Sequence, residues 1–282
     1  VTDANGCSAS DSVVVAEPTP VVLAALATNT LCNGDSSGTA YVTVTGGSAP
    51  YTFLWNTGAT TDSIAGLGIG TYFVTVTDIN GCSTSDTVIV NDPASITLAS
   101  NATNVLCFGD SAGTAYVTVT GGLAPYTFLW NNGATADSIA GLAAGTYFIT
   151  VTDANGCSAL DSVVVTEPTP VVLATAAADA LCFGDSSGTA YVTATGGSAP
   201  YTFLWNTGAT ADSIAGLAAG TYFVTVTDIN GCSTSDTVVV AEPTPIALAA
   251  LATNTLCNGD SSGTAYVTVT GGSAPYTFLW NT

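Results

Sequence analysis

Cysteine and carboxylate side chains are the groups in this sequence that could do chemistry. The eight cysteines form two series that each recur at one constant interval, namely Cys7, Cys82, Cys157 and Cys232, and Cys32, Cys107, Cys182 and Cys257. None belongs to a C-x-x-C pair and the chain has no histidine, so a zinc site is a poor interpretation. Disulfides and free buried thiols are the alternatives.

The lack of Lys, Arg and His excludes several classes of function. The acidic residues give a formal charge of −20 at pH 7 with no side-chain cation to balance it. Nucleic-acid binding needs cations against phosphates, and a catalytic triad with histidine cannot form. Paired carboxylates can hydrolyse glycosides, but these acids lie in scattered turns, so we expect no enzyme. Hydrophobic residues make up 47% of the chain, which is enough for folded cores, yet no apolar run is long enough to span a bilayer.

The interval between cysteines of one series reveals a repeat of about 75 residues. Proline-rich joints with the sequences AEPTP, NDPAS, TEPTP and AEPTP recur at the same period, and proline stiffens such joints. We place the domain boundaries there, which predicts three complete repeats, 19–93, 94–168 and 169–243. Residues 1–18 are then the C-terminal part of an earlier repeat and 244–282 the N-terminal part of a later one. We therefore interpret the sequence as an excerpt of a longer chain.

Each repeat has the sequence pattern of short β-strands. β-branched and aromatic residues dominate, helical periodicity is absent, and turn residues such as those in CNGDSSG and DING interrupt the pattern. In the first complete repeat we expect strands at 21–28, 39–45, 51–55, 60–67, 70–77 and 83–90. Six or seven short strands with turns about every 8–12 residues predict a β-sandwich.

Two aromatic residues indicate which sandwich this is. Trp55 lies on the third expected strand, where immunoglobulin-like domains often bury a Trp, and Tyr72 begins the penultimate strand as in a tyrosine corner. Aromatics at alternating strand positions usually fill the core, so neither implies a ligand. The predicted fold class is therefore all-β, a tandem array of immunoglobulin-like β-sandwich domains, with Trp55, Tyr72, Trp130, Tyr147, Trp205 and Tyr222 in their cores.

The stretch 106–157 combines several motifs, namely C-x-G, GG-x-x-PY, a Trp four residues after that Tyr, L-x-x-G-x-Y and V-T-D-x-N-G-C. As a set they resemble the SprB-type repeat of giant surface adhesins of Bacteroidetes, and the resemblance covers nearly the whole chain. It implies an extracellular, cell-surface location and a role in adhesion or gliding motility, and it supplies no catalytic residues.

Two cysteines at fixed places in a surface-type β array favour disulfides. We favour pairing within a repeat, Cys32 with Cys82, Cys107 with Cys157, and Cys182 with Cys232. Topology raises an objection, because in an ordinary sandwich the corner after the first strand and the corner before the last strand lie at opposite ends. The alternative connects neighbouring repeats, Cys32 with Cys157 and Cys107 with Cys232.

The same topology brings oxygen ligands toward each joint. Hard oxygen ligands without nearby cations suit Ca²⁺, although Asp and Asn also occur in turns for conformational reasons. No cofactor is required, but a calcium site at the two joints would use Asp35, Asp92, Asp153 and Asn155, and Asp110, Glu167, Asp228 and Asn230.

Asp-Ser/Thr-apolar triplets recur in every repeat. The resemblance to Bacteroidetes proteins implies O-glycans on their hydroxyls, and the alternative is a polar residue on an exposed edge strand. The candidate sites are Ser12, Ser63, Thr87, Ser111, Ser138, Ser162, Ser213 and Thr237. Glycans there would cover sheet edges that otherwise invite pairing with other chains.

We therefore expect a non-enzymatic structural segment, a stalk or filament, of a giant extracellular adhesin. One alternative is a fibre that assembles from many chains, and another is an array of carbohydrate-binding modules. The expected partners are neighbouring repeats of the same chain, lateral copies of it, or surface polysaccharide. Uniform negative charge would keep such segments soluble and apart.

Overall fold

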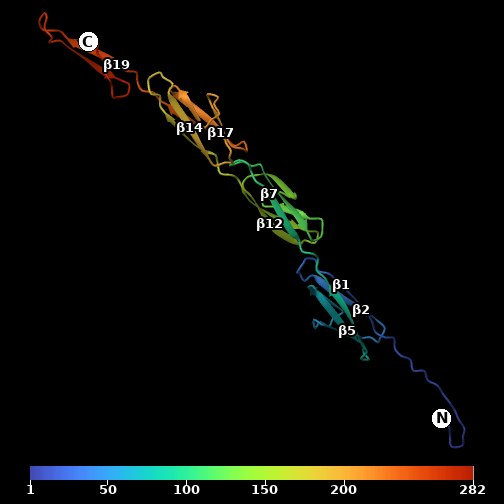
Figure 1. The fold of residues 1–282 in the computed structure, drawn as a ribbon. Helices are drawn as coiled ribbons and strands as arrows, with labels where there is room; N and C mark the ends of the chain where they lie inside the picture. Colours follow the sequence, from blue (N-terminus) through green and yellow to red (C-terminus); the bar gives the residue numbers. More distant parts are fainter. Residues whose placement is uncertain (282) are drawn as a thin grey trace. The chain divides into compact units, whose positions relative to one another are not determined.

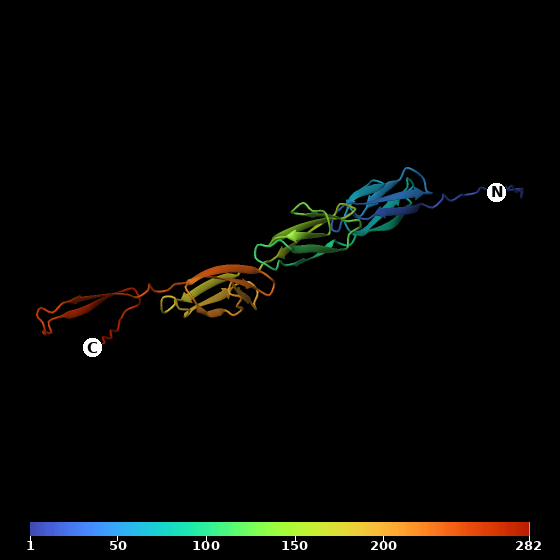
Figure 2. The same ribbon diagram turned by 90° about the horizontal axis from the view of Figure 1, so that it is seen from above.

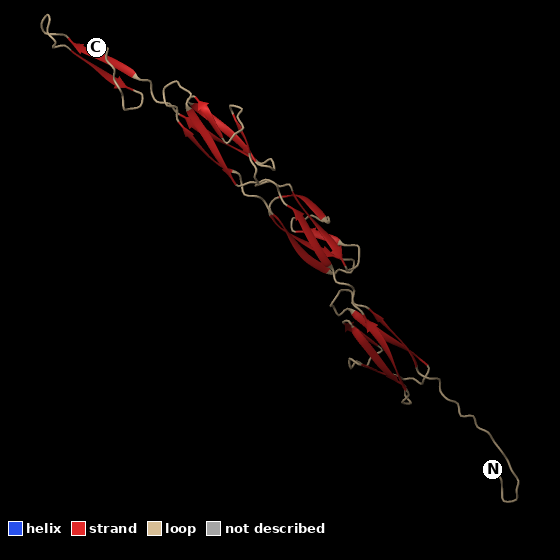
Figure 3. Ribbon diagram, in the orientation of Figure 1, coloured by secondary structure: helices blue, strands red, loops and turns tan. Residues whose placement is uncertain are grey.

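The computed structural model describes residues 1–281, and every regular element among them is a β-strand (Figure 3). The first complete repeat contains β1 (Val22–Thr28), β2 (Gly38–Thr45), β3 (Thr52–Trp55), β4 (Ser63–Leu67), β5 (Gly70–Thr77) and β6 (Ser83–Val90). These strands lie within or next to the six expected ranges, because alternation and turn residues mark them clearly.

The same six strands recur along the chain with the period of the cysteines. The second set is β7 (Thr97–Thr103), β8 (Gly113–Thr120), β9 (Thr127–Trp130), β10 (Ser138–Leu142), β11 (Gly145–Thr152) and β12 (Ser158–Val165). The third set is β13 (Val172–Ala178), β14 (Gly188–Thr195), β15 (Thr202–Trp205), β16 (Ser213–Leu217), β17 (Gly220–Thr227) and β18 (Ser233–Val240). The hairpin of β19 (Ala247–Thr253) and β20 (Thr264–Thr270) follows. The proline-rich joints fall between these sets, and the domain boundaries themselves stay a prediction.

By its packing the chain divides into two compact units. One comprises Val1–Asn101, Tyr116–Ile139 and Tyr147–Val163, and the other comprises Ala102–Ala115, Ala140–Thr146 and the chain from Val164 on. The first unit holds β1 to β6, and the second holds β13 to β20. The middle repeat contributes residues to both.

Every complete repeat forms two three-stranded antiparallel sheets. In the first unit the strand orders are β1-β2-β4 and β3-β5-β6, and in the second unit β13-β14-β16 and β15-β17-β18. Figures 1 and 2 show β1 and β2 as neighbouring ribbons of one sheet. This is the two-sheet arrangement of a seven-stranded immunoglobulin domain without its fourth strand. The sequence prediction of an immunoglobulin-like sandwich is therefore confirmed by strand order.

The core of the first repeat lies between the two sheets and draws on both of them. Ala40 and Val42 on β2 and Val74 and Val76 on β5 are at most 5% exposed, and they share one cluster with Trp55, which is 2% exposed. The equivalent cluster of the third repeat contains Trp205. Alternate residues point outward, as the period of two along a strand requires.

The polar atoms of the core aromatics are bonded to backbone carbonyls. The indole Nε1 of Trp55 donates to the Thr61 carbonyl at 2.9 Å, and the Tyr72 hydroxyl donates to the Gly68 carbonyl at 3.0 Å, which is a tyrosine corner. Trp130, Trp205 and Tyr222 make the corresponding bonds, and Tyr147 lies half-buried at the corresponding place. Trp55, Tyr72, Trp130, Trp205 and Tyr222 are structural, because backbone carbonyls satisfy their polar atoms.

The first and last strands of a repeat run beside each other in the same direction. In the first unit, Ala25 N–H donates to Asp86 Oδ2 at 2.9 Å and Thr30 N–H donates to the Asn91 carbonyl at 3.2 Å. Both pairs are separated by 61 residues, so the two strands advance in parallel. The second unit repeats the pattern with Thr175 Oγ1 on Asp236 and Ala180 N–H on Ala241.

Gly38 permits the close approach of these elements. A Cβ at Gly38 would lie 2.6 Å from the Leu67 carbonyl oxygen and 2.7 Å from Val90 Cγ1. The register between β2 and β4 shifts at this residue, as is common where glycine lets two backbones meet.

Candidate functional site

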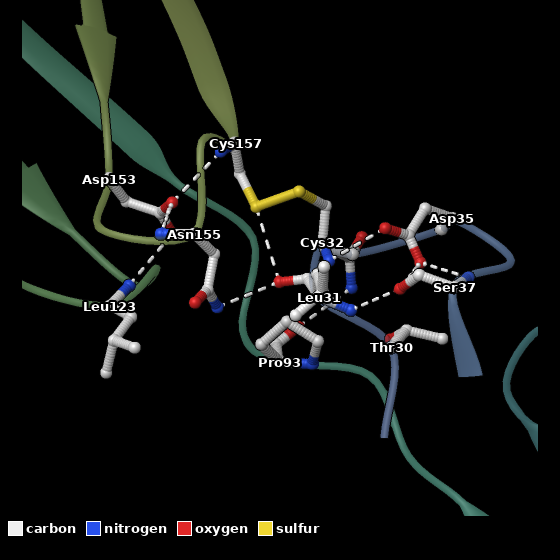
Figure 4. Close-up of a disulfide and its surroundings, with 12 residues drawn as sticks. Thr30, Leu31, Cys32, Asp35, Ser37, Pro93, Leu123, Asp153, Asn155 and Cys157 are labelled. Carbon is white, nitrogen blue, oxygen red and sulfur yellow. Dashed lines mark hydrogen bonds between the residues drawn. A yellow bond between two sulfur atoms is a disulfide. The ribbon is translucent and has the colours of Figure 1, made fainter. Parts of the chain in front are cut away.

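Two disulfides connect elements that are far apart in the sequence. Cys32 follows β1 and pairs with Cys157, which precedes β12, with a Cα–Cα distance of 5.6 Å (Figure 4). Cys107 follows β7 and pairs with Cys232, which precedes β18, at 5.5 Å. Both disulfides span 125 residues of sequence. Each therefore joins one repeat to the next.

The favoured pairing within a repeat is wrong, and the parallel course of β1 and β6 explains why. Cys32 lies just beyond the end of β1, beside Asn91 at the end of β6, whereas Cys82 lies before the start of β6. The extended chain from Cys82 to Asn91 spans about 30 Å, while a disulfide needs Cα atoms within about 7 Å. The same geometry excludes Cys107 with Cys157 and Cys182 with Cys232.

The remaining thiols are those of Cys7, Cys82, Cys182 and Cys257, and all four are exposed. Disulfides therefore exist in the chain, but they follow the alternative connectivity.

The corner that holds Cys32 is shaped by a local carboxylate. Asp35 accepts hydrogen bonds from Cys32 N–H at 3.0 Å and from Ser37 N–H at 3.0 Å, which closes the turn (Figure 4). The Ser37 backbone bond, with smaller contributions from the Ser37 hydroxyl and Cys32 N–H, holds the pKa of Asp35 below its usual value despite the opposing effect of burial. Asp185 and Asp260 close the equivalent corners in the second unit.

The joint carries a second carboxylate that fastens the same corner. Asp92 accepts hydrogen bonds from Gly34 N–H at 2.8 Å and from the Thr30 hydroxyl at 2.6 Å. Glu167 and Glu242 accept the equivalent bonds from Gly109 and Gly184 at 2.7 and 2.6 Å. Sequence reasoning missed this role, although an acid before the first proline of every joint was its signal.

The turn that holds Cys157 is organised by Asp153, which is 7% exposed. Its Oδ1 accepts from Asn155 and Cys157 N–H, and its Oδ2 accepts from Leu123 N–H at 3.0 Å. Burial raises the pKa of Asp153, but the hydrogen bonds from backbone N–H groups, those of Leu123 and Cys157 foremost, outweigh this effect, so the pKa lies below its usual value. Asp78 and Asp228 behave in the same way.

The two halves of the joint meet at one carbonyl group. Asn155 Nδ2 donates to the Leu31 carbonyl at 3.1 Å, and Cys157 Sγ lies 3.3 Å from the same oxygen (Figure 4). Asn230 and Cys232 make the equivalent contacts with Leu106 in the second unit, at 3.4 and 3.3 Å. The asparagine of the D-x-N-G-C motif therefore positions the disulfide.

The carboxylates proposed as calcium ligands are directed at separate backbone groups. Figure 4 shows Asp35 and Asp153 on either side of the disulfide, each bonded to N–H groups of its own surroundings. Asn155 donates its Nδ2 to the Leu31 carbonyl. Among residues 1–281, no three His, Cys, Asp or Glu side chains gather where they could hold a metal ion. Chelation tests the calcium site that the sequence suggests.

The candidate glycan sites are all exposed. Ser63, Ser138 and Ser213 begin β4, β10 and β16, while Thr87, Ser162 and Thr237 lie on β6, β12 and β18, which are sheet edges. Ser111 lies in a corner and Ser12 lies before β1. The aspartates of the triplets on β6 and β18 have a structural role, since Asp86 and Asp236 bond the first strand.

The outward face of the sheet β3-β5-β6 carries no charge. Leu54, Phe73 and Ile89 on it are 56%, 49% and 60% exposed, and the residues around them are Thr and Ser. Equivalent exposed residues recur as Leu129, Phe148 and Val164, and as Leu204, Phe223 and Val239. Sequence reasoning found no aromatic outside the core, yet these three Phe residues lie outside it, because they occupy the strand positions between the buried ones.

Four stretches of the chain match one protein family. The SprB repeat matches residues 24–60, 99–135, 174–210 and 249–282, about half of the chain. The chain belongs to the SprB repeat family. The expected resemblance is thereby confirmed. In the three complete repeats, the match covers most of the first strand, the second and third strands, and the corner with the first cysteine.

The solved structures to which the chain is similar include multidomain immunoglobulin proteins. The chain is similar to the N-terminal eight Ig domains of Down Syndrome Cell Adhesion Molecule, with 10% identity and a TM-score of 0.30, covering 82% of this chain and 49% of that one. It is also similar to Dpr2 Ig1-Ig2 in complex with DIP-Theta Ig1-Ig3, with 11% identity and a TM-score of 0.27, covering 79% and 94%. The chain thus spans about half the length of the eight-domain protein. No curated protein sequence matches it.

Residues 1–281 contain no helix that is long and apolar enough to cross a membrane.

Proposed function

We propose that this chain is a non-enzymatic structural segment of an extracellular adhesin, a stalk whose repeats serve attachment or gliding motility. The observation that carries the proposal is the pair of disulfides that join each repeat to the next. Disulfides persist in oxidising, extracellular surroundings. A disulfide between neighbouring repeats is useful to a protein whose repeats must stay joined in a fixed arrangement.

Membership in the SprB repeat family supports the same function. The carboxylates that sequence reasoning considered for catalysis or metal binding are engaged in closing turns and joints. We propose that the segment fulfils this role without a cofactor. The negative charge of −20 resides in the loops and joints and on one strand edge of each repeat.

Electron microscopy of the native particle tests the proposal through its mass per unit length. By proportion from 27.8 kDa for 282 residues, one repeat weighs about 7.4 kDa, and a sandwich of this size advances a stalk by about 40 Å. A single-stranded stalk should show the mass of one repeat, plus any glycan, for each length of one repeat. A globular particle, or catalytic turnover of a glycan by the purified chain, would overturn it.

A fibre of many chains is the second candidate, and the uncharged outer face of the sheet β3-β5-β6 favours it. In a chain without cations, Leu54, Phe73 and Ile89 form an apolar surface that a second copy could cover without bringing carboxylates together. The same measurement decides between the candidates, since lateral assembly multiplies the mass per unit length. Glycans on Thr87 and its equivalents would block this face, because Thr87 pairs with Phe73 across the strands.

A further inference from the structure

We propose that the array is an inextensible tether, in which tension passes along two interleaved covalent threads and bypasses the folded cores. A stalk that unfolded under tension would still satisfy the function proposed above, so this inference goes beyond it. The connectivity of the disulfides carries the argument.

The first thread runs through Cys32. From there the disulfide leads directly to Cys157, and the chain continues along β12, the joint and β13 to Cys182. Along the chain itself Cys182 lies two full periods beyond Cys32, whereas it lies only one third of a period beyond Cys157. The disulfide therefore shortens the covalent path sixfold.

The second thread uses the strands that the first one leaves out. It begins at Cys82 and follows β6, the joint and β7 to Cys107. The disulfide carries it to Cys232, and β18, the next joint and β19 carry it to Cys257. In each repeat one thread thus follows the first strand and the other follows the last strand.

Each thread is nearly extended in the folded protein. Between Cys157 and Cys182, eight residues lie in β12 and seven lie in β13. A strand rises about 3.3 Å per residue against a maximum of about 3.6 Å, so these strands can lengthen by only about 5 Å. Pro168 and Pro170 lie in the joint between them and favour an extended backbone there.

The remainder of each repeat lies off the path of tension. The residues between Cys107 and Cys157 contain β8 to β11, and those between Cys32 and Cys82 contain β2 to β5. The Trp of each repeat and most of its core residues belong to these segments. Force on the threads therefore does not pull directly on the strands that hold most of the core.

The two threads are also tied to each other inside each repeat. The first and last strands run in parallel, with Ala25 N–H on Asp86 and Thr30 N–H on the Asn91 carbonyl. Ser100 N–H on Asp161 and Val105 N–H on the Thr166 carbonyl repeat the arrangement. Since both threads advance in the same direction, shared tension does not shear these bonds.

Pulling single molecules with optical tweezers tests the proposal. Handles attach through thioethers to the exposed thiols of Cys82 and Cys257 in a chain that carries Cys7→Ser and Cys182→Ser. The oxidised path through Cys107 and Cys232 contains about 50 residues, half of them on each side of the disulfide, so extension should end at about 180 Å. A phosphine reductant transfers two electrons to each disulfide, and water supplies the protons of the two thiols and the oxygen of the phosphine oxide. The whole chain of about 175 residues between the handles is then released, and extension should reach about 630 Å.

Two matched double variants separate this path from a general effect of disulfide loss. Cys32→Ser/Cys157→Ser removes a disulfide outside the path and should leave the limit at about 180 Å. Cys107→Ser/Cys232→Ser leaves a path of about 150 residues through the other disulfide, with a limit of about 540 Å. If a variant folds poorly, the phosphine experiment still tests the proposal, because it starts from the folded chain with both disulfides.

Other limits overturn the proposal. Pairing within repeats would leave a path of about 125 residues between the handles, which corresponds to about 450 Å. Unfolding steps in the oxidised chain before it reaches about 180 Å would show that the cores bear the tension. Neither outcome affects the mass per unit length, so the test of the stalk function is independent of the test of the tether.

Discussion

Cys32 and Cys157 are 125 residues apart in the sequence, and their Cα atoms are 5.6 Å apart in the structure. Leu31, the neighbour of Cys32, receives a hydrogen bond from Asn155 at the same contact. The disulfide is thus built into a bonded corner and a bonded turn, and the acids Asp35 and Asp153 shape these two elements.

Removing one of the two disulfides should lower the free energy of unfolding considerably. Cys107→Ser/Cys232→Ser opens a loop of 125 residues, which costs about 5 kcal/mol in the chain-entropy account of disulfides. Unfolding in guanidinium chloride, followed by circular dichroism, measures the change. Cys182→Ser is the control, because Cys182 is exposed and unpaired, and it should stay within about 0.5 kcal/mol. Equal effects of both changes would contradict the connectivity.

The neighbouring residues Leu204 and Trp205 should respond very differently to truncation. Trp205 is 2% exposed within the core, so Trp205→Ala should cost about 3–5 kcal/mol of unfolding free energy. Leu204 points outward and is 56% exposed, so Leu204→Ala should change it by less than about 0.5 kcal/mol. Chemical unfolding of the two variants makes the comparison, and a costly Leu204→Ala would show that the outer face is covered.

Acid should weaken the fold through the buried turn aspartates. The pKa values of Asp78, Asp153 and Asp228 lie below the ordinary 3.8. A lowered carboxyl pKa contributes stability that is fully present above the ordinary value and is lost as the pH falls below it. Melting temperatures should therefore be level above about pH 5 and fall below about pH 4.

A variant tests whether the turn aspartates cause this fall in melting temperature at low pH. Asp228→Asn removes one charge that three N–H groups contact, from Ser198, Asn230 and Cys232, and should make the acid fall in melting temperature shallower. Glu17→Gln, at an exposed position outside the strands, is the matched control. If the melting temperature of the wild type and that of Asp228→Asn fall identically with acid, the turn is not the origin of the effect.

Chelation should leave the melting curve unchanged. The candidate calcium ligands Asp35, Asp92 and Asp153 are occupied by N–H and hydroxyl donors, so they are satisfied without a cation. Calorimetry with EDTA and with added Ca²⁺ checks this directly. A fall of several degrees with EDTA that Ca²⁺ restores would establish the calcium site that the sequence suggested.

Much of the fold was predictable from local patterns. The alternation of Ala40, Val42 and Val44 predicts one buried face, because side chains alternate along a strand. The position of Trp55 predicts a core residue for the same reason. Turn residues such as those in DING end the strands wherever they occur. Strand number, repeat length, core aromatics and family membership therefore follow from the sequence alone.

Tertiary structure decided how the chemical groups are used. Local patterns do not say that β1 and β6 run in parallel, and this relation places Cys32 far from Cys82 and leaves it free to meet Cys157. Likewise, an Asp in a turn is equally suited to a cation and to a backbone N–H until its neighbours are known, and Asp153 is directed at N–H groups. Cysteine pairing and carboxylate roles depend on which distant segments meet, and that is set by the packing of two sheets around one core.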